Sequence, residues 1–171
     1  GTEFARRAQA FHPACITGVR RTVKPSDPAF TAIHAIAELD SVLPETDILV
    51  MALPSTAETV GILSRERIAL LPDSAFVVNV GRGTAIDQEA LCDALNAGQL
   101  AGAALDVVVP EPLPADHPLR RAKNLLLTPH VAGNMTLGYT CDKSVQMFCD
   151  DLENYAAGRP LAHLVDRKRG Y

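Results

Sequence analysis

The sequence predicts an α/β protein built on a parallel, doubly wound β-sheet. Short apolar runs that resemble strands alternate with segments of helical periodicity, and the connections between them are short. Some of these runs, such as 47–53 and 75–80, are almost entirely apolar, which is typical of strands buried on both faces. The 171 residues suffice for one domain with a proper core, and 47% hydrophobic with 21% charged residues is an ordinary globular balance.

The expected elements follow one another along the whole chain. Residues 2–11 place Phe4, Ala8 and Phe11 on one face, as an amphipathic helix would. Apolar runs predict strands over residues 15–19, 32–36, 47–53, 75–80, 103–109 and 125–128. Helices are predicted after residue 36 as far as residue 43, and over residues 64–70, 87–97 and 136–157.

Capping residues support two of these helices. Asp87 is the expected N-cap of the helix over 87–97, and Gly98 is its expected end. Gly158 and Pro160 close the last helix, because neither residue continues a helix readily.

Candidate site residues follow directly after the apolar runs. Arg20, Pro54, Arg82, Glu111 and His130 each come just after one of them. Open α/β sheets bind ligands outside the carboxyl ends of their strands. The sequence therefore predicts a site at this edge of the sheet.

Arg82, Glu111 and His130 are the candidate catalytic residues. They lie in the segments NVGRG, ALDVVVPEP and TPHVAG. A guanidinium can hold a carboxylate with two donors and polarise the neighbouring carbonyl, and an imidazole can exchange a proton near neutral pH. A paired carboxylate would favour the imidazolium, so the set suits reduction of a 2-oxo acid by a nicotinamide.

Each candidate also has a plainer interpretation. Arg82 could be an ion-pairing arginine, Glu111 a solvated loop acid and His130 a strand cap. Asp106 lies inside an apolar strand, where it needs a polar ligand or a backbone donor nearby. The remaining histidines lack such contexts and are expected to be structural or exposed: His12, His34, His117 and His163.

Composition narrows the class of protein. A net charge of −4 and a pI near 5.7 argue against a surface for nucleic acid or anionic membranes. No apolar run is long enough to span a bilayer, and no segment resembles a signal peptide. The four scattered cysteines lack the spacing of a metal site, which indicates a reducing cytoplasm and no metal.

Four segments together resemble the cofactor domain of the D-isomer-specific 2-hydroxyacid dehydrogenases, in that family's order and approximate spacing. They are residues 43–59, 70–83, 104–114 and 128–133. The resemblance implies a Rossmann-like fold in which Arg82 binds the substrate, His130 is the acid/base and Glu111 is its partner. It also implies a set of residues along the cofactor: Gly1, Leu53, Pro54, Thr59, Val80, Gly81, Arg82, Asp106, His130 and Gly133. Within that set, Asp106 is expected near the nicotinamide carboxamide, and the residues from 53 to 59 towards the adenosine.

The segment ITGVRRT (16–22) bears on the choice of cofactor. Arg20 stands where NAD-using relatives usually carry an aspartate. With Arg21 and Thr22 it is expected to pair with the 2′-phosphate of NADP, so NADP is favoured over NAD. The alternative is an exposed basic loop tip.

One feature departs from the family pattern. The glycine-rich turn GxGxxG is absent apart from Gly1, interpreted as its last glycine, and the central first strand is not found either. We therefore expect a fragment of a longer enzyme, incomplete for folding or activity by itself. Residues 1–150 would be its dinucleotide-binding domain, incomplete at the N-terminus. Residues 151–171 would be a helix end and a tail returning toward a separate substrate domain.

The leading hypothesis is NADPH-dependent reduction of a small 2-oxo acid such as glyoxylate or hydroxypyruvate. Formate dehydrogenases of the same superfamily carry an amide where Glu111 stands, and a bulkier substrate such as 3-phosphoglycerate stays open. A dinucleotide-sensing interaction module, similar to the transcriptional corepressors of this fold, is the alternative from another class. An inert remnant is a third. The resemblance implies a homodimer acting on a small molecule.

Overall fold

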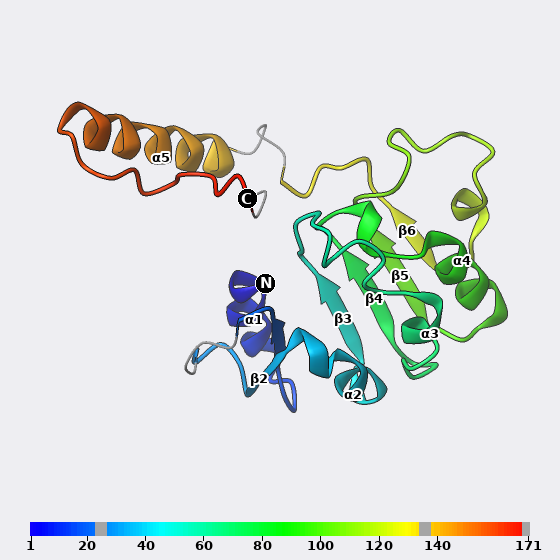
Figure 1. Ribbon diagram of the computed structural model, residues 1–171. Helices are drawn as coiled ribbons and strands as arrows, with labels where there is room; N and C mark the ends of the chain where they lie inside the picture. The colour runs from blue at the N-terminus through cyan, green and yellow to red at the C-terminus, as the bar shows by residue number, and fades with distance from the viewer. Residues whose placement is uncertain (23–26, 134–137, 169–171) are drawn as a thin grey trace.

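The computed structural model describes residues 1–22, 27–133 and 138–168 (Figure 1). Its strands form two parallel sheets. The smaller sheet pairs β1 (Thr17–Arg20) with β2 (Ala32–Ala35). The larger sheet holds the other strands in chain order: β3 (Ile48–Met51), β4 (Phe76–Asn79), β5 (Gly102–Leu105) and β6 (Leu125–Leu127).

Helices precede, separate and follow the strands. The α-helices are α1 (Thr2–Ala8), α2 (Leu39–Val42), α3 (Arg65–Ile68), α4 (Gln88–Ala97) and α5 (Gly138–Ala156). The 3-10 turns are η1 (Gln9–Phe11), η2 (Ile36–Glu38), η3 (Leu43–Glu45), η4 (Gly83–Ala85) and η5 (Pro118–Arg121). None of the described helices combines the length and apolar character needed to cross a membrane.

Parallel pairing brings the chemistry to one edge. The strands β3 to β6 all run in the same direction, so their carboxyl ends lie at the same edge of the larger sheet (Figure 1). Among the described strands, no pairing joins β1 to β3. The described strands therefore form two separate sheets rather than one continuous sheet.

Helix α4 forms where its capping residues predict it. The Asp87 carboxylate accepts a hydrogen bond of 2.9 Å from the Ala90 N–H, and Gly98 ends the helix with a φ of 74°. Its buried face includes Leu91 and Leu95, which belong to the core cluster of the larger sheet. Helix α4 is thus fixed against the core of the larger sheet.

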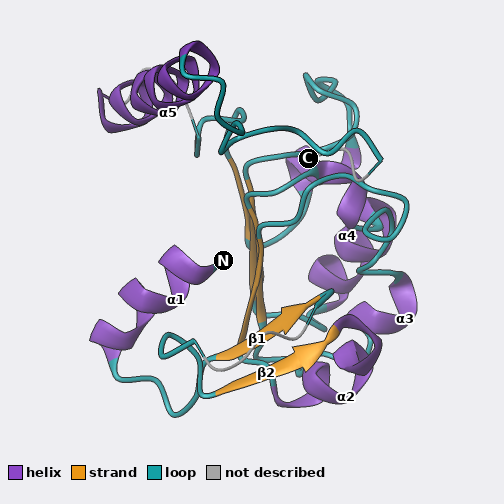
Figure 2. Ribbon diagram, turned by 60° about the vertical axis from the view of Figure 1, so that its left-hand side comes forward, coloured by secondary structure: helices purple, strands orange, loops and turns teal. Residues whose placement is uncertain are grey.

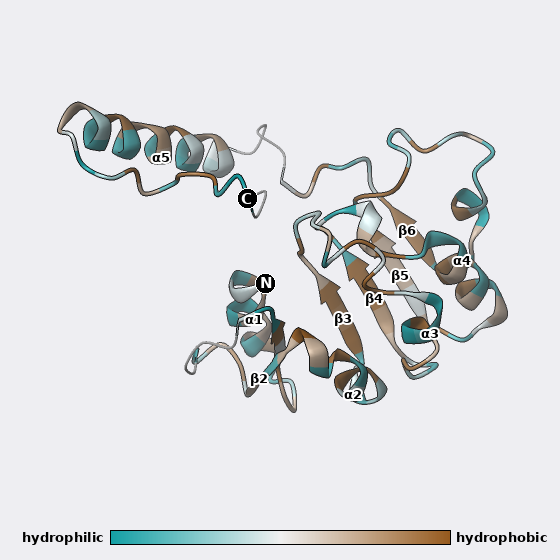
Figure 3. Cartoon of the chain, viewed as in Figure 1, coloured by the Kyte–Doolittle hydropathy of each residue, from teal (hydrophilic) through white to brown (hydrophobic). Residues whose placement is uncertain are grey.

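The two faces of the larger sheet differ. Helices α3 and α4 cover one face, against which Val77 and Ala103 are buried (Figure 2). On the other face, Ile48 is 60% and Phe76 48% exposed. The prediction that strands 47–53 and 75–80 are buried on both faces is therefore wrong for that face. The strands are nevertheless as apolar as the sequence suggests (Figure 3).

Other differences concern the ends of elements. The strand predicted over 103–109 stops at Leu105, because the chain turns at Asp106 to make a loop. In α1 the buried residue is Ala5, whereas Phe4 and Phe11 are exposed. The helix predicted from residue 136 is observed from Gly138, and residues 136 and 137 lie outside the described part of the chain.

Candidate active site

Glu111 and His130 come together at the carboxyl ends of β5 and β6. Nδ1 of His130 lies 2.8 Å from Oε2 of Glu111, and the Val108 N–H donates to Oε1 over 3.0 Å. The hydrogen bond from His130 and that from Val108 lower the pKa of Glu111, although partial burial opposes them. Since Nδ1 is occupied by Glu111, Nε2 is the ring atom left to exchange a proton with a ligand. Both side chains remain accessible to solvent.

Asp106 holds the turn that carries His130. The carboxylate accepts hydrogen bonds from the Thr128 hydroxyl (2.6 Å) and from the Val131 and Ala132 N–H groups (2.9 Å each). Its backbone carbonyl accepts from the His130 N–H over 2.9 Å. Burial by itself would raise the pKa of Asp106, but these hydrogen bonds outweigh it and the pKa is lowered. The sequence predicts that Asp106 needs a polar partner nearby, and this turn supplies it.

His130 itself has a backbone conformation that side chains rarely adopt. Its φ is +56°, in the left-handed region. The bonds to Asp106 on both sides of this residue keep the turn in that conformation. These bonds restrict the loop to one backbone conformation, in which the imidazole points toward Glu111.

Asn79 holds the turn that carries Arg82, just as Asp106 holds the turn that carries His130. It is 1% exposed, its Oδ1 accepts from the Gly81 N–H (3.0 Å), and its Nδ2 donates to the Arg82 carbonyl (2.9 Å). Sequence reasoning missed this residue. The signal was present, because a polar side chain inside the apolar run FVVNV needs partners just as Asp106 does.

The glycines on either side of Arg82 allow close approach of backbone. A Cβ on Gly81 would lie 2.6 Å from the backbone of Leu53, and one on Gly83 would lie 2.4 Å from that of Val108. No larger residue fits without a shift of the neighbouring loop. The Arg82 segment is therefore locked between the loop after β3 and the loop that carries Glu111.

The three predicted catalytic residues thus share one edge of the sheet. Arg82 is exposed, its Nη1 donates to the Gly81 carbonyl over 2.7 Å, and its charge contributes to the lowered pKa of Glu111. The Arg82 guanidinium therefore lies near enough to the Glu111–His130 pair to act on it electrostatically. Such a set can bind an anionic carboxylate and pass a proton to an oxygen beside it.

Arg20 and Arg21 lie at the carboxyl end of β1. Arg20 is half-buried, 3.5 Å from the Asp27 carboxylate and 4.8 Å above the Phe30 ring. Arg21 lies 3.7 Å from Glu58, in the loop that follows β3. This contact links the end of β1 to the loop after β3. Each arginine therefore has a carboxylate neighbour.

The remaining predicted cofactor residues come from several segments of the chain. Thr59 is buried, and its hydroxyl donates to the Pro54 carbonyl over 2.6 Å, so it holds the loop after β3. Val80 is 43% exposed at the end of β4. Leu53 and Pro54 are partly buried, while Gly1, Thr22 and Gly133 are exposed.

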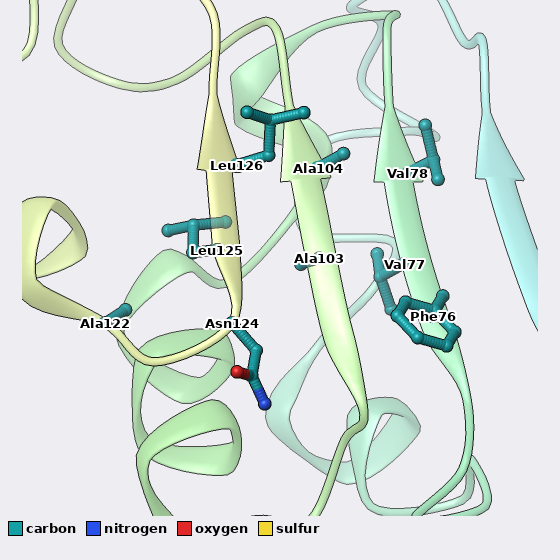
Figure 4. Close-up of a pocket in the computed structure, with 9 residues that line it drawn as sticks. All are labelled: Phe76, Val77, Val78, Ala103, Ala104, Ala122, Asn124, Leu125 and Leu126. Carbon is teal, nitrogen blue, oxygen red and sulfur yellow. The ribbon is translucent and has the colours of Figure 1, made fainter.

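A separate hollow of about 480 Å³ lies on the larger sheet, away from these groups (Figure 4). Side chains of β4, β5 and β6, including Phe76 and Leu126, line it, and Asn124 is its polar member. It contains no acid, base or cation. The hollow therefore lacks the chemistry found at the strand ends.

Comparison with known proteins places this arrangement in a family. A sequence profile described as "D-isomer specific 2-hydroxyacid dehydrogenase, NAD binding domain" matches residues 1–132. The chain is 40% identical over 135 residues to glyoxylate/hydroxypyruvate reductase A of Klebsiella pneumoniae (strain 342). That match covers 79% of this chain and 42% of the reductase, so the chain spans less than half of that relative's length.

Solved structures agree in sequence and in fold. A D-isomer specific 2-hydroxyacid dehydrogenase from Xanthobacter autotrophicus Py2, in complex with NADPH and MES, superposes with a TM-score of 0.84 at 36% identity. The match covers 97% of this chain and 66% of that one. An NADPH-dependent glyoxylate/hydroxypyruvate reductase from Sinorhizobium meliloti, in complex with NADP and sulfate, gives 0.83 at 28% identity, covering 98% and 53%.

Proposed function

Because the chain belongs to the D-isomer specific 2-hydroxyacid dehydrogenase family, we propose that it is the NAD(P)-binding part of an enzyme that interconverts a small 2-oxo acid and its 2-hydroxy acid. The observation that carries this proposal is the 2.8 Å contact between His130 and Glu111 beside the guanidinium of Arg82. The pair can supply the proton that reduction of a carbonyl needs.

Each of the three residues has a defined role in this proposal. Arg82 holds the substrate carboxylate and polarises the neighbouring carbonyl oxygen. Nε2 of His130 gives a proton to that oxygen during reduction and takes one during oxidation. Glu111 bonds Nδ1 and so fixes which ring nitrogen faces the substrate. The nicotinamide, when bound, supplies or accepts the hydride.

The residues along the edge of the sheet fit a dinucleotide. Val80 offers an exposed apolar surface at the end of β4, and the Gly133 region is open, with nothing within 4 Å of a Cβ placed there. Arg20 and Arg21 supply cationic donors at the end of β1. Guanidinium groups suit a phosphate, so we propose that NADP is preferred over NAD. The NADPH and NADP bound to the two solved relatives support this preference.

The substrate is proposed to be of the glyoxylate or hydroxypyruvate type. The reductase from K. pneumoniae supports this class, and an acid at Glu111 suits a substrate that must gain a proton. The enzyme, expressed from its complete gene, is expected to oxidise NADPH in the presence of glyoxylate or hydroxypyruvate. Absence of oxidation with a panel of 2-oxo acids, together with tight binding of NADPH, would instead indicate a dinucleotide-sensing module.

Assembly and location are also part of the proposal. We propose a homodimer in the cytoplasm. The four free cysteines suit a reducing compartment, and the exposed apolar residues of the larger sheet are surface that an assembly could cover. Analytical ultracentrifugation of the enzyme from its complete gene tests the dimer, and a single monomeric species at micromolar concentration would contradict it.

A further inference from the structure

The side chain of Gln88 makes two hydrogen bonds to the loop that carries Glu111. Its Nε2 donates to the Val109 carbonyl over 2.6 Å, and its Oε1 accepts from the Val109 N–H over 2.9 Å. The two residues are 21 positions apart, and one amide thus occupies both polar groups of a single loop residue. A side chain with one donor and one acceptor in a rigid plane is needed for this pairing.

Gln88 belongs to a rigid element. Gln88 is the first residue of α4, whose N-cap Asp87 is bonded to Ala90 and whose inner face is buried in the core. A helix fixed in this way moves little relative to the sheet. The hydrogen bonds of Gln88 therefore hold the loop in a fixed place relative to α4.

The loop is held a second time at the neighbouring residue. The backbone of Val108 lies against Gly83, where a Cβ would come within 2.4 Å of it. The peptide between Val108 and Val109 is thus restrained at its carbonyl side by Gly83 and at its N–H by Gln88. Both restraints come from the segment that directly follows Arg82.

This peptide adjoins the group that orients Glu111. The Val108 N–H donates to Oε1 of Glu111, and Oε2 of the same carboxylate meets His130. A shift of Val108 would disturb its hydrogen bond to Glu111. It would thereby also disturb the contact between Glu111 and His130. Glu111 is more than a third exposed, so burial does little to hold it in place.

We propose that Gln88 is a positioning residue for the acid–base pair, acting through the Val109 and Val108 backbone on Glu111. Both hydrogen bonds of its amide group go to the Val109 backbone. The inference rests on the proposed function of Glu111 and His130. It couples the segment after Arg82 to the loop that carries Glu111.

The test compares Gln88→Ala and Gln88→Met with the wild-type enzyme expressed from its complete gene. Met matches the length of Gln and loses both hydrogen bonds, so it preserves packing if Ala does not. Gln99→Ala is the matched control, because Gln99 is an exposed glutamine near the other end of the same helix. The readouts are the pKa of Glu111 by carboxyl NMR, the pH profile of kcat/KM, and the Kd for NADPH.

Loss of these two hydrogen bonds is expected to raise the pKa of Glu111, which is faced by His130 and Arg82, and to move the acidic limb of the pH profile upward with it. We expect kcat to fall roughly tenfold, short of the ~10²–10⁴ contributed by an acid–base group itself, with the Kd for NADPH unchanged. If the pKa of Glu111 and the pH profile match those of Gln99→Ala, the proposal is overturned, whatever happens to kcat. A wild-type enzyme without turnover would refute the proposed function, while the NMR titration would still decide the role of Gln88.

Discussion

Nδ1 of His130 and Oε2 of Glu111 lie 2.8 Å apart, although the two residues are 19 positions apart and follow neighbouring parallel strands. Neither side chain is buried, so the contact depends on the loops that present them. The His130 turn is held by Asp106, and the Glu111 loop by Val108 and Gln88. The site is therefore built on a scaffold of buried polar groups and close backbone contacts.

Replacing His130 tests its role in proton transfer. His130→Ala is expected to lower kcat by roughly 10²–10⁴, because the proton donor is lost, while NADPH binding stays nearly intact. Steady-state kinetics and a fluorescence titration of NADPH measure the two quantities. His163→Ala is the control, since His163 also pairs with a carboxylate through Nδ1, at 3.4 Å from Asp151. Wild-type turnover in His130→Ala would rule the role out.

The acid dependence of stability tests the Glu111–His130 contact. The hydrogen bond from His130, followed by that from Val108, makes the folded-state pKa of Glu111 lower than its unfolded value. The carboxylate thus stabilises the fold above the unfolded pKa, and this contribution is lost as pH falls through the folded pKa. Glu111→Gln should therefore show a shallower loss of unfolding free energy between about pH 5 and 3. The difference should stay under about 1 kcal/mol, because the pair is exposed. Urea titrations at several pH values measure it, and parallel curves would contradict the contact.

Removing the charge of Asp106 tests the scaffold of the His130 turn. In Asp106→Asn one oxygen becomes an N–H donor and faces a backbone N–H or the Thr128 hydroxyl, which then has no acceptor. Leaving a buried donor unsatisfied costs about 1–3 kcal/mol of unfolding free energy. Asp93→Asn is the control, because Asp93 pairs with Arg65 on the surface and should change stability by less than about 0.5 kcal/mol. Equal stability of the two variants would show that the turn does not depend on Asp106.

A methyl group at Gly83 tests the lock between the Arg82 segment and the Glu111 loop. Gly83→Ala places a Cβ about 2.4 Å from the Val108 backbone, so the loop must move. We expect a loss of about 1–3 kcal/mol in stability and a lower kcat. Gly138→Ala is the control, because nothing lies within 4 Å of its Cβ position. Thermal unfolding of both variants decides, and unchanged values for Gly83→Ala would contradict the close packing.

Cofactor preference tests the role of the arginines after β1. Arg20→Ala and Arg21→Ala should each weaken binding of NADPH roughly tenfold or more, because a charge-assisted hydrogen bond to phosphate is lost. Binding of NADH should change little, since it lacks the 2′-phosphate. Isothermal titration with both cofactors gives the ratio. An equal loss for NADH and NADPH would assign these arginines to the fold instead, through Asp27 and Glu58.

The order and type of the elements could be predicted from the sequence. Mainly apolar runs marked β3 and β4, and Asp87 with Gly98 marked the ends of α4, because periodicity and capping are local properties of the chain. The placement of Arg82, Glu111 and His130 after successive strands was also predictable. Parallel strands carry whatever follows them to one edge of the sheet.

Only the tertiary structure showed what holds these residues. Gln88 meets Val109 from 21 positions away, and the Asp106 carboxylate meets the turn that begins at Thr128. The bare face of the larger sheet, with Ile48 exposed, depends likewise on which helices pack where. Periodicity and motifs describe neighbours along the chain, whereas a hydrogen bond depends on distances in space. Those distances are set only when the sheet, the helices and the loops have packed together.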